Sequence, residues 1–525
     1  MKPSVAVGLV LMAVGALVLR LPQLDERPLH TDESVHAIKF LGLWEGAGYR
    51  YDPHEYHGPF LYYASLPVAW MSGASPSDRG GLSESILRLT PVLWGSGLVL
   101  LLFLTWRLMG TVPTLWAGVF TAVSPVMVFY SRYYIHEILL AALTFGFLGC
   151  AWGYWRDPRR AWMLGAGVCL GLMHATKETF VFPLAAAVGA GLAAWGWSRL
   201  RHEPSARVNW KGKDLAWGFA AAAAVSLTLF TSFFSNWQGP LDAWRTYGPW
   251  LARAEGESPH VHPWSFYWTR LLYTRVGSGP TWSEGLIFGL GLIAMVRALG
   301  AGKWPGVDRG WARWLTFYTL LLSALYTAIP YKTPWCVLGF WHGWILLAGL
   351  GVASAMTRLR WLPWRIGFAA VLLAGTLHLG VQARRMAIHY ADSQRNPWVY
   401  AHTLSSVLGL VERVEALAQV AGDDPPLVIK VMTAGGDYWP LPWYLRERAT
   451  GWYPGVPAEP DEAFAPIVIA SPQFGPDLRE TLGDRLQALG LFGLRPGVFL
   501  QLHVEPGLWE RYLNLDREGA IPREP

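Results

Sequence analysis

Charged residues are scarce in this sequence of 525 residues. Asp, Glu, Lys and Arg make up only 15% of the chain, whereas soluble domains carry roughly 25%. This scarcity argues against an ordinary cytosolic enzyme and against a disordered chain. Hydrophobic residues make up 52% of the chain, which also contains 31 Trp, 22 Phe and 21 Tyr. That composition is typical of a polytopic membrane protein with aromatic belts at the bilayer surfaces.

Cysteine is also nearly absent, and the usual nucleotide-binding motifs are missing. Cys150, Cys169 and Cys336 all lie in apolar stretches and form no C-x-x-C pair, so a secreted disulfide framework is excluded. The sequence contains neither G-x-G-x-x-G nor a P-loop. The net charge of +6 comes mostly from short loops between apolar runs, where it reports topology. We therefore expect no nucleic-acid partner.

Long apolar runs dominate the first three quarters of the chain. A transmembrane helix needs about 20 mostly apolar residues, and the runs predict a polytopic α-helical membrane protein with about eleven transmembrane helices. The predicted spans are 5–21, 86–108, 113–130, 138–155, 161–175, 180–197, 215–234, 282–299, 311–329, 335–356 and 363–381.

The loops between these spans carry the basic residues unevenly. Dense clusters of Lys and Arg fall at 156–160, 199–213, 297–313 and 358–365, on alternate connections. The positive-inside rule places these loops in the cytoplasm, together with the N-terminus. We therefore expect a multi-pass protein of the plasma membrane, with the loops 22–85 and 235–281 and the tail on the outer side.

The tail differs in character from the rest of the chain. An amphipathic helical pattern runs through Leu404–Leu417, and short β-like runs follow at 427–432, 467–470 and 498–504, with a helix around 478–489. The sequence therefore predicts two domains. Residues 1–381 form the transmembrane domain, and residues 382–525 form a small extracytoplasmic α/β domain.

The first outer loop holds the densest cluster of polar residues. One segment is His30-Thr31-Asp32-Glu33-Ser34-Val35-His36, and a second is Tyr51-Asp52-Pro53-His54-Glu55-Tyr56-His57. Thr31 at a helix start would place Asp32 and His36 on one face at i, i+4. Acidic residues in a first helical turn also stabilise the helix dipole. The second acidic and histidine-rich segment favours a site over this purely structural interpretation.

A metal site in this loop is a weaker interpretation. His54 and His57 stand at i, i+3, whereas the zinc motif H-E-x-x-H needs i, i+4. A looser divalent site could combine Asp32, Glu33, Asp52 and His57. We favour a site that requires neither a metal nor another cofactor.

Further polar residues interrupt the outer connections between spans. Arg132 could extend to the interface, whereas Glu137 opens an apolar helix at a depth where an unpaired carboxylate is costly. Lys177 and Glu178 could pair within their turn, or Lys177 could bind an anionic headgroup. Lys332 lies in a similar turn. The aromatic run 262–268 suits an interfacial belt or a carbohydrate platform.

Taken together, these segments resemble a known group of membrane enzymes, the GT-C superfamily of glycosyltransferases. Within it the chain is similar to glycosyltransferase family 39, which includes the protein mannosyltransferases and the lipid A aminoarabinose transferase, and most similar to the "flippase activity-associated" subgroup. The residues that carry the resemblance are His30–Ala37, Tyr51-Asp52-Pro53, Tyr56-His57-Gly58-Pro59, Ser124-Pro125, Tyr130-Ser131-Arg132, Glu137, Lys177-Glu178, Tyr331–Trp335, Asn396–Thr403 and Tyr438–Arg446.

The resemblance implies transfer of a sugar from a polyprenyl-phosphate donor to a protein, lipid or glycan acceptor on the outer face. Asp32 matches the catalytic aspartate, which acts as the general base, and Glu33 matches its neighbour. Lys177, Arg132 and Lys332 match the need for cations at the departing lipid phosphate, and Glu137 matches a second acidic position. His36, Asp52 and His57 complete the predicted substrate-binding set.

Three functions are compatible with this sequence. The first is an inverting glycosyltransferase that uses a polyprenyl-phosphate sugar. The alternative is a non-catalytic membrane protein that binds lipid-linked glycans or assists a flippase on the same scaffold, since a fold does not establish a reaction. A secondary transporter is less favoured, because transporters commonly contain inverted repeats and no repeat is evident.

Overall fold

The protein forms two compact units. The computed structural model describes residues 3–54, 57–78, 81–203, 210–255, 260–302, 304–422 and 426–517. Glu55 and Tyr56 of the second polar segment therefore lie outside the described residues. The helical unit comprises Met1–Leu24, Gly46–Ser72 and Ser85–Tyr400. The sheet unit comprises Asp25–Glu45, Gly73–Glu84 and Ala401–Pro525, so it takes two segments from the first predicted loop.

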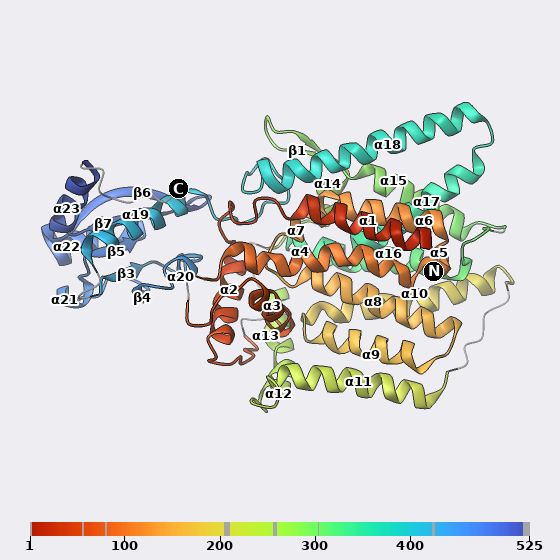
Figure 1. Ribbon diagram of the computed structural model, residues 1–525, viewed down its shortest axis with the longest axis horizontal. Helices are drawn as coiled ribbons and strands as arrows, with labels where there is room; N and C mark the ends of the chain where they lie inside the picture. The colour runs from red at the N-terminus through yellow and green to blue at the C-terminus, as the bar shows by residue number, and fades with distance from the viewer. Residues whose placement is uncertain are drawn as a thin grey trace. The chain divides into compact units, whose positions relative to one another are not determined.

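The helical unit is built almost entirely from helices (Figure 1). The longer helices are α1 (Pro3–Arg20), α3 (Phe60–Met71), α4 (Glu84–Leu101), α6 (Thr111–Val123), α8 (Glu137–Arg156), α9 (Arg160–His174), α10 (Val181–Leu200), α11 (Gly212–Phe230), α15 (Gly285–Leu299), α16 (Arg309–Ala328), α17 (Val337–Arg358) and α18 (Leu362–Arg384). Short elements join them, namely α5 (Trp106–Met109), α7 (Pro125–Tyr130), α12 (Gly239–Arg245), α13 (Tyr247–Glu255), α14 (Phe266–Leu272) and the hairpin of β1 (Thr274–Arg275) and β2 (Thr281–Trp282).

Helices cover all eleven predicted spans, which confirms the polytopic helical fold class. Among the described residues, seven helices are long and apolar enough to cross a membrane: α1, α4, α8, α10, α11, α17 and α18, some with a short helical extension. The other four predicted spans fall on α6 with α7, α9, α15 and α16. Of these, α6, α9 and α15 have only 13, 15 and 15 residues, which is short for a crossing.

Burial separates the interior helices from the peripheral ones. In α17 83% of the apolar span is buried, whereas in α10, α11 and α18 the figure is 22%. α17 packs on α6, α8, α15 and α16 and forms the centre of the unit. The peripheral helices expose large apolar side chains such as Val188, Trp217 and Leu373, as expected of helices that face lipid.

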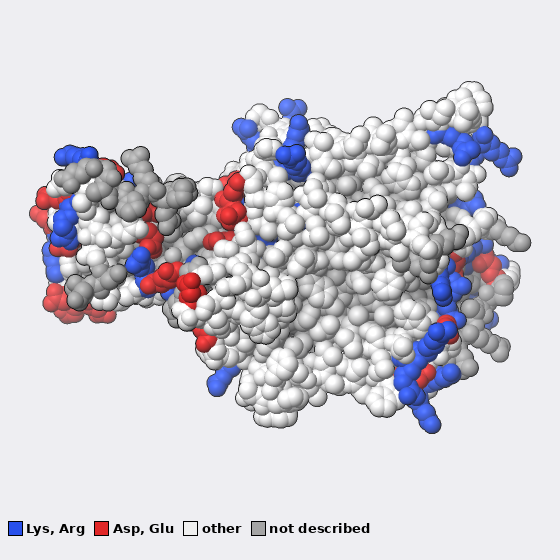
Figure 2. Space-filling model, viewed as in Figure 1, with Lys and Arg blue, Asp and Glu red and all other residues white. Residues whose placement is uncertain are grey.

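Charges occupy a restricted part of the helical unit's surface. Figure 2 shows many of the Lys and Arg residues at the end of the helices where α8 is followed by α9, with further groups near β1 and between α17 and α18, while most of the visible side is free of charge. This distribution agrees with a multi-pass membrane protein. The assignment of that end to the cytoplasm stays a prediction.

Two buried side chains, those of Arg20 and Glu284, hydrogen-bond to the backbone on either side of the helix break between α6 and α7. Pro125 has no N–H, so the carbonyl of Thr121 lacks its usual helical donor. Arg20 of α1 donates instead, to Thr121 O at 3.1 Å and to Ala122 O at 3.0 Å. On the other side of the break, Glu284 accepts from Val126 N at 2.9 Å and Ser124 Oγ at 2.5 Å. The break therefore fixes the start of the 131–137 segment.

The sheet unit is a five-stranded mixed sheet covered by helices on both faces (Figure 1). Its strands are β3 (Val428–Met432), β4 (Ala449–Tyr453), β5 (Ile467–Ala470), β6 (Gln487–Arg495) and β7 (Val498–Val504), in the order β4-β3-β5-β7-β6. β3 runs parallel to β4 and β5, and β7 runs antiparallel to β5 and β6. The helices of this unit, not all of which lie against the sheet, are α2 (Thr31–Trp44), α19 (Ser406–Ala421), α20 (Leu441–Tyr444), α21 (Pro460–Ala463), α22 (Gly475–Leu482) and α23 (Pro506–Arg517).

Side-chain alternation explains why both faces of this sheet are covered. Ile429 and Ile467 pack with α19 in one apolar cluster, whereas Val468 packs with Leu478 of α22 in another. Because alternate residues of a strand point to opposite faces, the run Ile467–Ala470 is buried throughout. An apolar run without alternation is what a strand covered on both faces requires.

The predicted elements of the tail are mostly present, with two corrections. The runs at 427–432, 467–470 and 498–504 are strands, and the amphipathic pattern forms α19. The helix predicted at 478–489 ends at Leu482, because Gly483 leaves the helical conformation with a φ of 54°, and residues from Gln487 pair with β7. β4 and β6 were not predicted. The division into a transmembrane domain, 1–381, and an extracytoplasmic domain, 382–525, stays a prediction.

Candidate active site

Asp32 and Glu33 lie in the first turn of α2, in the sheet unit. His30 is the N-cap of this helix, and its Nδ1 accepts from the backbone N–H of Asp32 at 3.1 Å. The Glu33 carboxylate closes the capping box by accepting from His30 N at 2.9 Å. Glu33 also pairs with the Arg27 guanidinium at 2.7 Å. Glu33 is thus completely buried and holds the turn in place.

The carboxylate of Asp32 is placed quite differently from that of its neighbour. Its side chain is 44% exposed, and its Oδ1 lies 3.8 Å from His30 Nδ1. His36, one turn later on the same helix, is buried. The first turn of α2 therefore presents one accessible carboxylate on a rigid, capped support. That is the geometry a general base needs, since it has to reach the proton it removes.

Glu137 and Lys177 form a buried ion pair in the helical unit. Glu137 opens α8, Lys177 follows α9, and the Lys177 Nζ donates to Glu137 Oε1. Both side chains are less than a tenth exposed. Burial alone would lower the pKa of the Lys177 ammonium, but the adjacent Glu137 carboxylate outweighs burial and the pKa is raised. Lys177 therefore stays a cation at any physiological pH.

His57 and Glu178 form a second pair beside the first. His57 Nδ1 lies 2.9 Å from Glu178 Oε2, and the Tyr51 hydroxyl donates to Glu178 Oε1 at 3.2 Å. Gly58 allows this arrangement, because a Cβ there would lie 2.2 Å from the Ala175 carbonyl oxygen. Lys177 and Glu178 were expected to pair with one another in one interpretation, yet each pairs with a residue from another segment.

A cavity lies directly against the Glu137 end of this arrangement. It has about 360 Å³ of empty space, open solvent included, and is lined mainly by apolar side chains of α8, α10, α16 and the turn before α17, among them Leu140, Leu322, Tyr326 and Trp335. A second cavity, with about 400 Å³ of empty space including open solvent, lies further along α8 and α17. Ala141, Thr144 and Gly339 line both cavities. The two cavities therefore adjoin one another.

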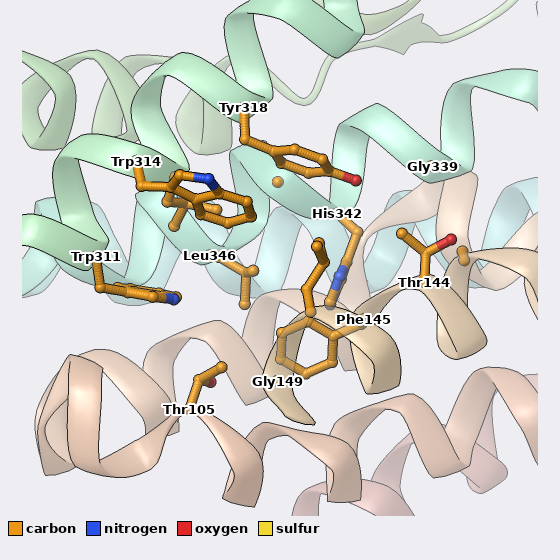
Figure 3. Close-up of a pocket in the computed structure, with 14 residues that line it drawn as sticks. Thr105, Thr144, Phe145, Gly149, Trp311, Trp314, Tyr318, Gly339, His342 and Leu346 are labelled. Atoms are coloured by element: carbon orange, nitrogen blue, oxygen red, sulfur yellow. The ribbon is translucent and has the colours of Figure 1, made fainter. Parts of the chain in front are cut away.

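Several aromatic side chains line the second cavity. Figure 3 shows Trp311, Trp314 and Tyr318 of α16 facing Phe145 of α8 and His342 of α17. The His342 ring packs edge-on against Phe145 with ring centroids 4.9 Å apart. An apolar, aromatic lining of this kind suits hydrocarbon better than water.

Arg132 and Lys332 bind backbone carbonyls in the helical unit. The Arg132 guanidinium donates to Arg20 O and Pro22 O at 2.6 Å each and to Gln23 O at 2.9 Å. Lys332 donates to His262 O at 3.1 Å and to Ile329 O. Burial lowers the pKa of the Lys332 ammonium. Both side chains thus hold the ends of helices, and their part in binding a phosphate stays a prediction.

Asp52 lies on the surface of the helical unit and is 41% exposed. It accepts from the backbone N–H of His54 at 2.9 Å, which is a local turn contact. In the described part of the chain, no three His, Cys, Asp or Glu side chains come together as metal ligands.

The predicted site residues fall into two groups, one in each unit. Asp32, Glu33 and His36 belong to the sheet unit, whereas Asp52, His57, Arg132, Glu137, Lys177 and Lys332 belong to the helical unit. The convergence of Asp32 with Glu137 stays a prediction. Sequence reasoning missed Glu284, although a carboxylate inside the predicted span 282–299 was a signal that could have revealed it.

Comparisons with known proteins point to one fold. The family model described as dolichyl-phosphate-mannose-protein mannosyltransferase matches residues 67–207. Crystal structures of ArnT from Cupriavidus metallidurans, bound to undecaprenyl phosphate and in the apo state, are similar to this chain with TM-scores of 0.63 and 0.62. Each covers 95% of this chain and 98% of its own chain at 15% identity. A search of curated protein sequences finds no match.

These findings confirm the resemblance that the sequence predicted. The chain has the GT-C fold along nearly its whole length, and the family model for mannosyltransferases matches a stretch that runs from α3 to the end of α10. Both likenesses are to membrane glycosyltransferases of the GT-C type.

The buried Glu137–Lys177 pair makes a prediction about stability. Lys177→Met leaves an unpaired carboxylate in the interior and should lower the free energy of unfolding by about 3–5 kcal/mol. In the double variant Lys177→Met/Glu137→Leu no charge is left unpaired, so most of that loss should be regained. Thermal and denaturant unfolding of the detergent-solubilised protein measures both.

The exposed pair of Arg159 and Asp157 supplies the control, since its side chains are 72% and 50% exposed. Arg159→Met should change stability by less than about 1 kcal/mol. A double variant as unstable as Lys177→Met would show that the pair does more than neutralise charge.

Proposed function

We propose that this protein is an integral-membrane glycosyltransferase that moves a sugar from a polyprenyl-phosphate donor to an acceptor on the outer face of the membrane. The observation that carries the proposal is the buried Glu137–Lys177 pair at the end of an apolar cavity. Glu137 lines the cavity and holds the Lys177 ammonium next to it. A cation fixed near a space suited to hydrocarbon is what a lipid phosphate requires. The GT-C fold supports the same reading, since ArnT was solved with undecaprenyl phosphate.

Lys177 is the residue that we assign to the lipid phosphate. Its ammonium has three donor protons, of which the structure commits one to Glu137. As the sugar leaves its carrier, negative charge grows on the phosphate, and a fixed cation in a dry site stabilises that charge strongly. Arg132 and Lys332 supply further positive charge in the same unit, and His57 stands beside Glu178 as a donor.

The two adjoining cavities provide a place for the polyprenyl chain. Their linings come from α8, α16 and α17 and consist mostly of apolar and aromatic side chains. Burial of hydrocarbon contributes about 0.8 kcal/mol per CH₂ group. A few isoprene units would therefore supply most of the affinity for the donor, while the phosphate contacts fix its position.

Asp32 is the residue that we assign to proton removal. It takes the proton of the acceptor hydroxyl while that oxygen attacks the anomeric carbon of the donor sugar. The bond from that carbon to the phosphate oxygen breaks, its electron pair stays with the phosphate, and the configuration at the carbon is inverted. Glu33, buried beneath Asp32, orients the turn.

Replacing Asp32 tests the chemical step. Asp32→Asn keeps the size of the side chain and removes the base, so transfer of radiolabelled sugar from a polyprenyl-phosphate donor should fall by about 10²-fold or more. Asp25→Asn, which alters an exposed carboxylate of the same unit, should keep the wild-type rate. Transfer by Asp32→Asn at the wild-type rate would rule out Asp32 as the base. A wild-type protein that binds the donor without turnover would favour a non-catalytic lipid-glycan binder.

Metal removal tests whether the transfer needs a divalent ion. The positive charge at the phosphate is assigned to side chains, so EDTA followed by desalting should leave the transfer rate unchanged. Loss of activity that Mg²⁺ or Mn²⁺ restores would contradict the proposal and would point to carboxylates such as Asp32 and Asp52 as ligands.

Filling the junction of the two cavities tests the place of the polyprenyl chain. Gly339 lines both cavities, and a Cβ added there meets no atom within 4 Å. Gly339→Leu should therefore fold normally, while its KM for the polyprenyl-phosphate sugar should rise by about tenfold. A donor with a one-isoprene chain should be affected less than the full-length donor.

Gly191 of α10 supplies the matched control. It is exposed on the outside of the helical unit, and a Cβ there also meets no atom within 4 Å. Gly191→Leu should leave the KM unchanged. If KM changes equally in both variants, or changes in neither variant, the polyprenyl chain does not bind in these cavities.

A further inference from the structure

Three aromatic side chains form a cluster at one edge of the sheet unit. Tyr438 packs against Trp439 with ring centroids 5.6 Å apart and against Trp452 with centroids 4.9 Å apart. Trp452 lies in β4, the outermost strand of the sheet, and is 36% exposed. Tyr438 and Trp439 are partly exposed as well. We call these three residues the aromatic platform.

The platform adjoins the edge where the parallel strands end. β3, β4 and β5 run in one direction, and β6 shares it because β7 runs antiparallel to both β5 and β6. The 433–437 loop leaves β3 at this edge, and its turn uses Gly435 and Gly436 with φ values of 58° and 81°. In open α/β sheets ligands bind outside this edge, where connections from adjacent strands diverge. Here β3 is followed by β4 on one side, and β5 lies on its other side.

A polar group at the same edge connects the platform with α2. Arg495, the last residue of β6, pairs with Asp437 and also donates to the Thr31 hydroxyl at 3.2 Å. Asp437 directly precedes the platform residue Tyr438, and Thr31 directly precedes Asp32. The Ser34 hydroxyl of α2 donates to Pro440 O at 3.3 Å. The first turn of α2 is therefore fixed beside the platform within one unit.

The combination of groups at this edge matches the chemistry of a saccharide. A pyranose ring has a face of C–H groups, which packs on the negative face of an aromatic ring. It also has hydroxyl groups, which hydrogen-bond well to charged side chains. Asp437 and Arg495 neutralise one another, so this pair offers no excess positive charge to a phosphate or a strongly acidic ligand. An apolar partner would leave the Asp437–Arg495 pair desolvated.

We propose that the aromatic platform binds a saccharide, and that the acceptor of this protein is accordingly a glycan. The acceptor sugar stacks on Trp452 and Tyr438 while Asp437 and Arg495 bind its hydroxyl groups. The link to acceptor choice rests on the proposed function, because Asp32 is the base only if the protein is a transferase. The binding of saccharide by the platform does not depend on it.

Ligand-detected saturation-transfer NMR on the full chain in lipid nanodiscs tests the platform. The probes are mannotriose, maltotriose and chitotriose, and a Ser/Thr-rich peptide represents a protein acceptor. At least one trisaccharide should receive saturation at its C–H protons. Trp452→Ala and Tyr438→Ala should each weaken its binding by about fivefold to tenfold.

Trp509 of α23 supplies the control. It stacks on Tyr512 with ring centroids 5.1 Å apart. It belongs to α23, which follows the end of β7; because β7 runs antiparallel to β5 and β6, this helix starts at the edge of the sheet opposite the platform. Trp509→Ala should therefore leave saccharide binding unchanged. Circular dichroism of each variant shows whether the sheet unit is intact, and Trp452→Phe, which keeps a flat ring, should retain most of the affinity.

Three outcomes would overturn the proposal. They are no saturation transfer to any trisaccharide, equal binding by Trp452→Ala and the wild type, or displacement of the sugar by the peptide with tighter binding. Release of radiolabelled sugar from the polyprenyl-phosphate donor is measured on the same samples and tests the proposed function separately. Donor turnover without saccharide binding would contradict only the proposal that the platform binds a saccharide. Saccharide binding without turnover would contradict only the proposal that the protein is a transferase.

Discussion

Burial of charge in an apolar interior is the constraint on which this structure depends. A charged side chain in such a place must be compensated, because the cost of leaving it unpaired exceeds what most single contacts contribute. The helical unit meets the requirement with partners from distant segments. Lys177 pairs with Glu137, Glu178 pairs with His57, and Arg20 donates to the Thr121 carbonyl, which Pro125 leaves without its helical donor. Each of these contacts therefore also fixes where two segments meet.

The same constraint separates the two acidic residues at the start of α2. The Glu33 carboxylate accepts from His30 N in the capping box and pairs with Arg27, so it is a structural group. The Asp32 carboxylate lies 3.8 Å from His30 Nδ1, and its side chain is 44% exposed. The two adjacent carboxylates thus differ in environment, because Glu33 stabilises the helix turn that carries Asp32. The cavities show a similar separation, since their linings are mostly apolar while Lys177 pairs with Glu137 at one end.

The sequence was sufficient for those features that a local pattern encodes. Apolar runs located the helices of the helical unit, and short apolar runs located β3, β5 and β7. Patterns could not reveal partners, because nothing in Lys177-Glu178 tells which distant side chain each will meet. They also misplaced the helix end at Leu482, since one glycine outweighed the apolar periodicity beyond it. The connection of Arg495 with Thr31 joins residues 464 positions apart, which lies beyond any local rule.

The sheet unit draws α2 from the beginning of the chain and its sheet from the end. Leu29 N donates to the Tyr444 hydroxyl at 2.9 Å across 415 residues. During synthesis α2 therefore waits for a partner that is made only after the helical unit is complete. Closing so long a loop is entropically slow. The order of synthesis thus delays the contacts between the α2 segment and the tail until the rest of the protein exists, so in an incomplete chain the Asp32 turn has only its local cap.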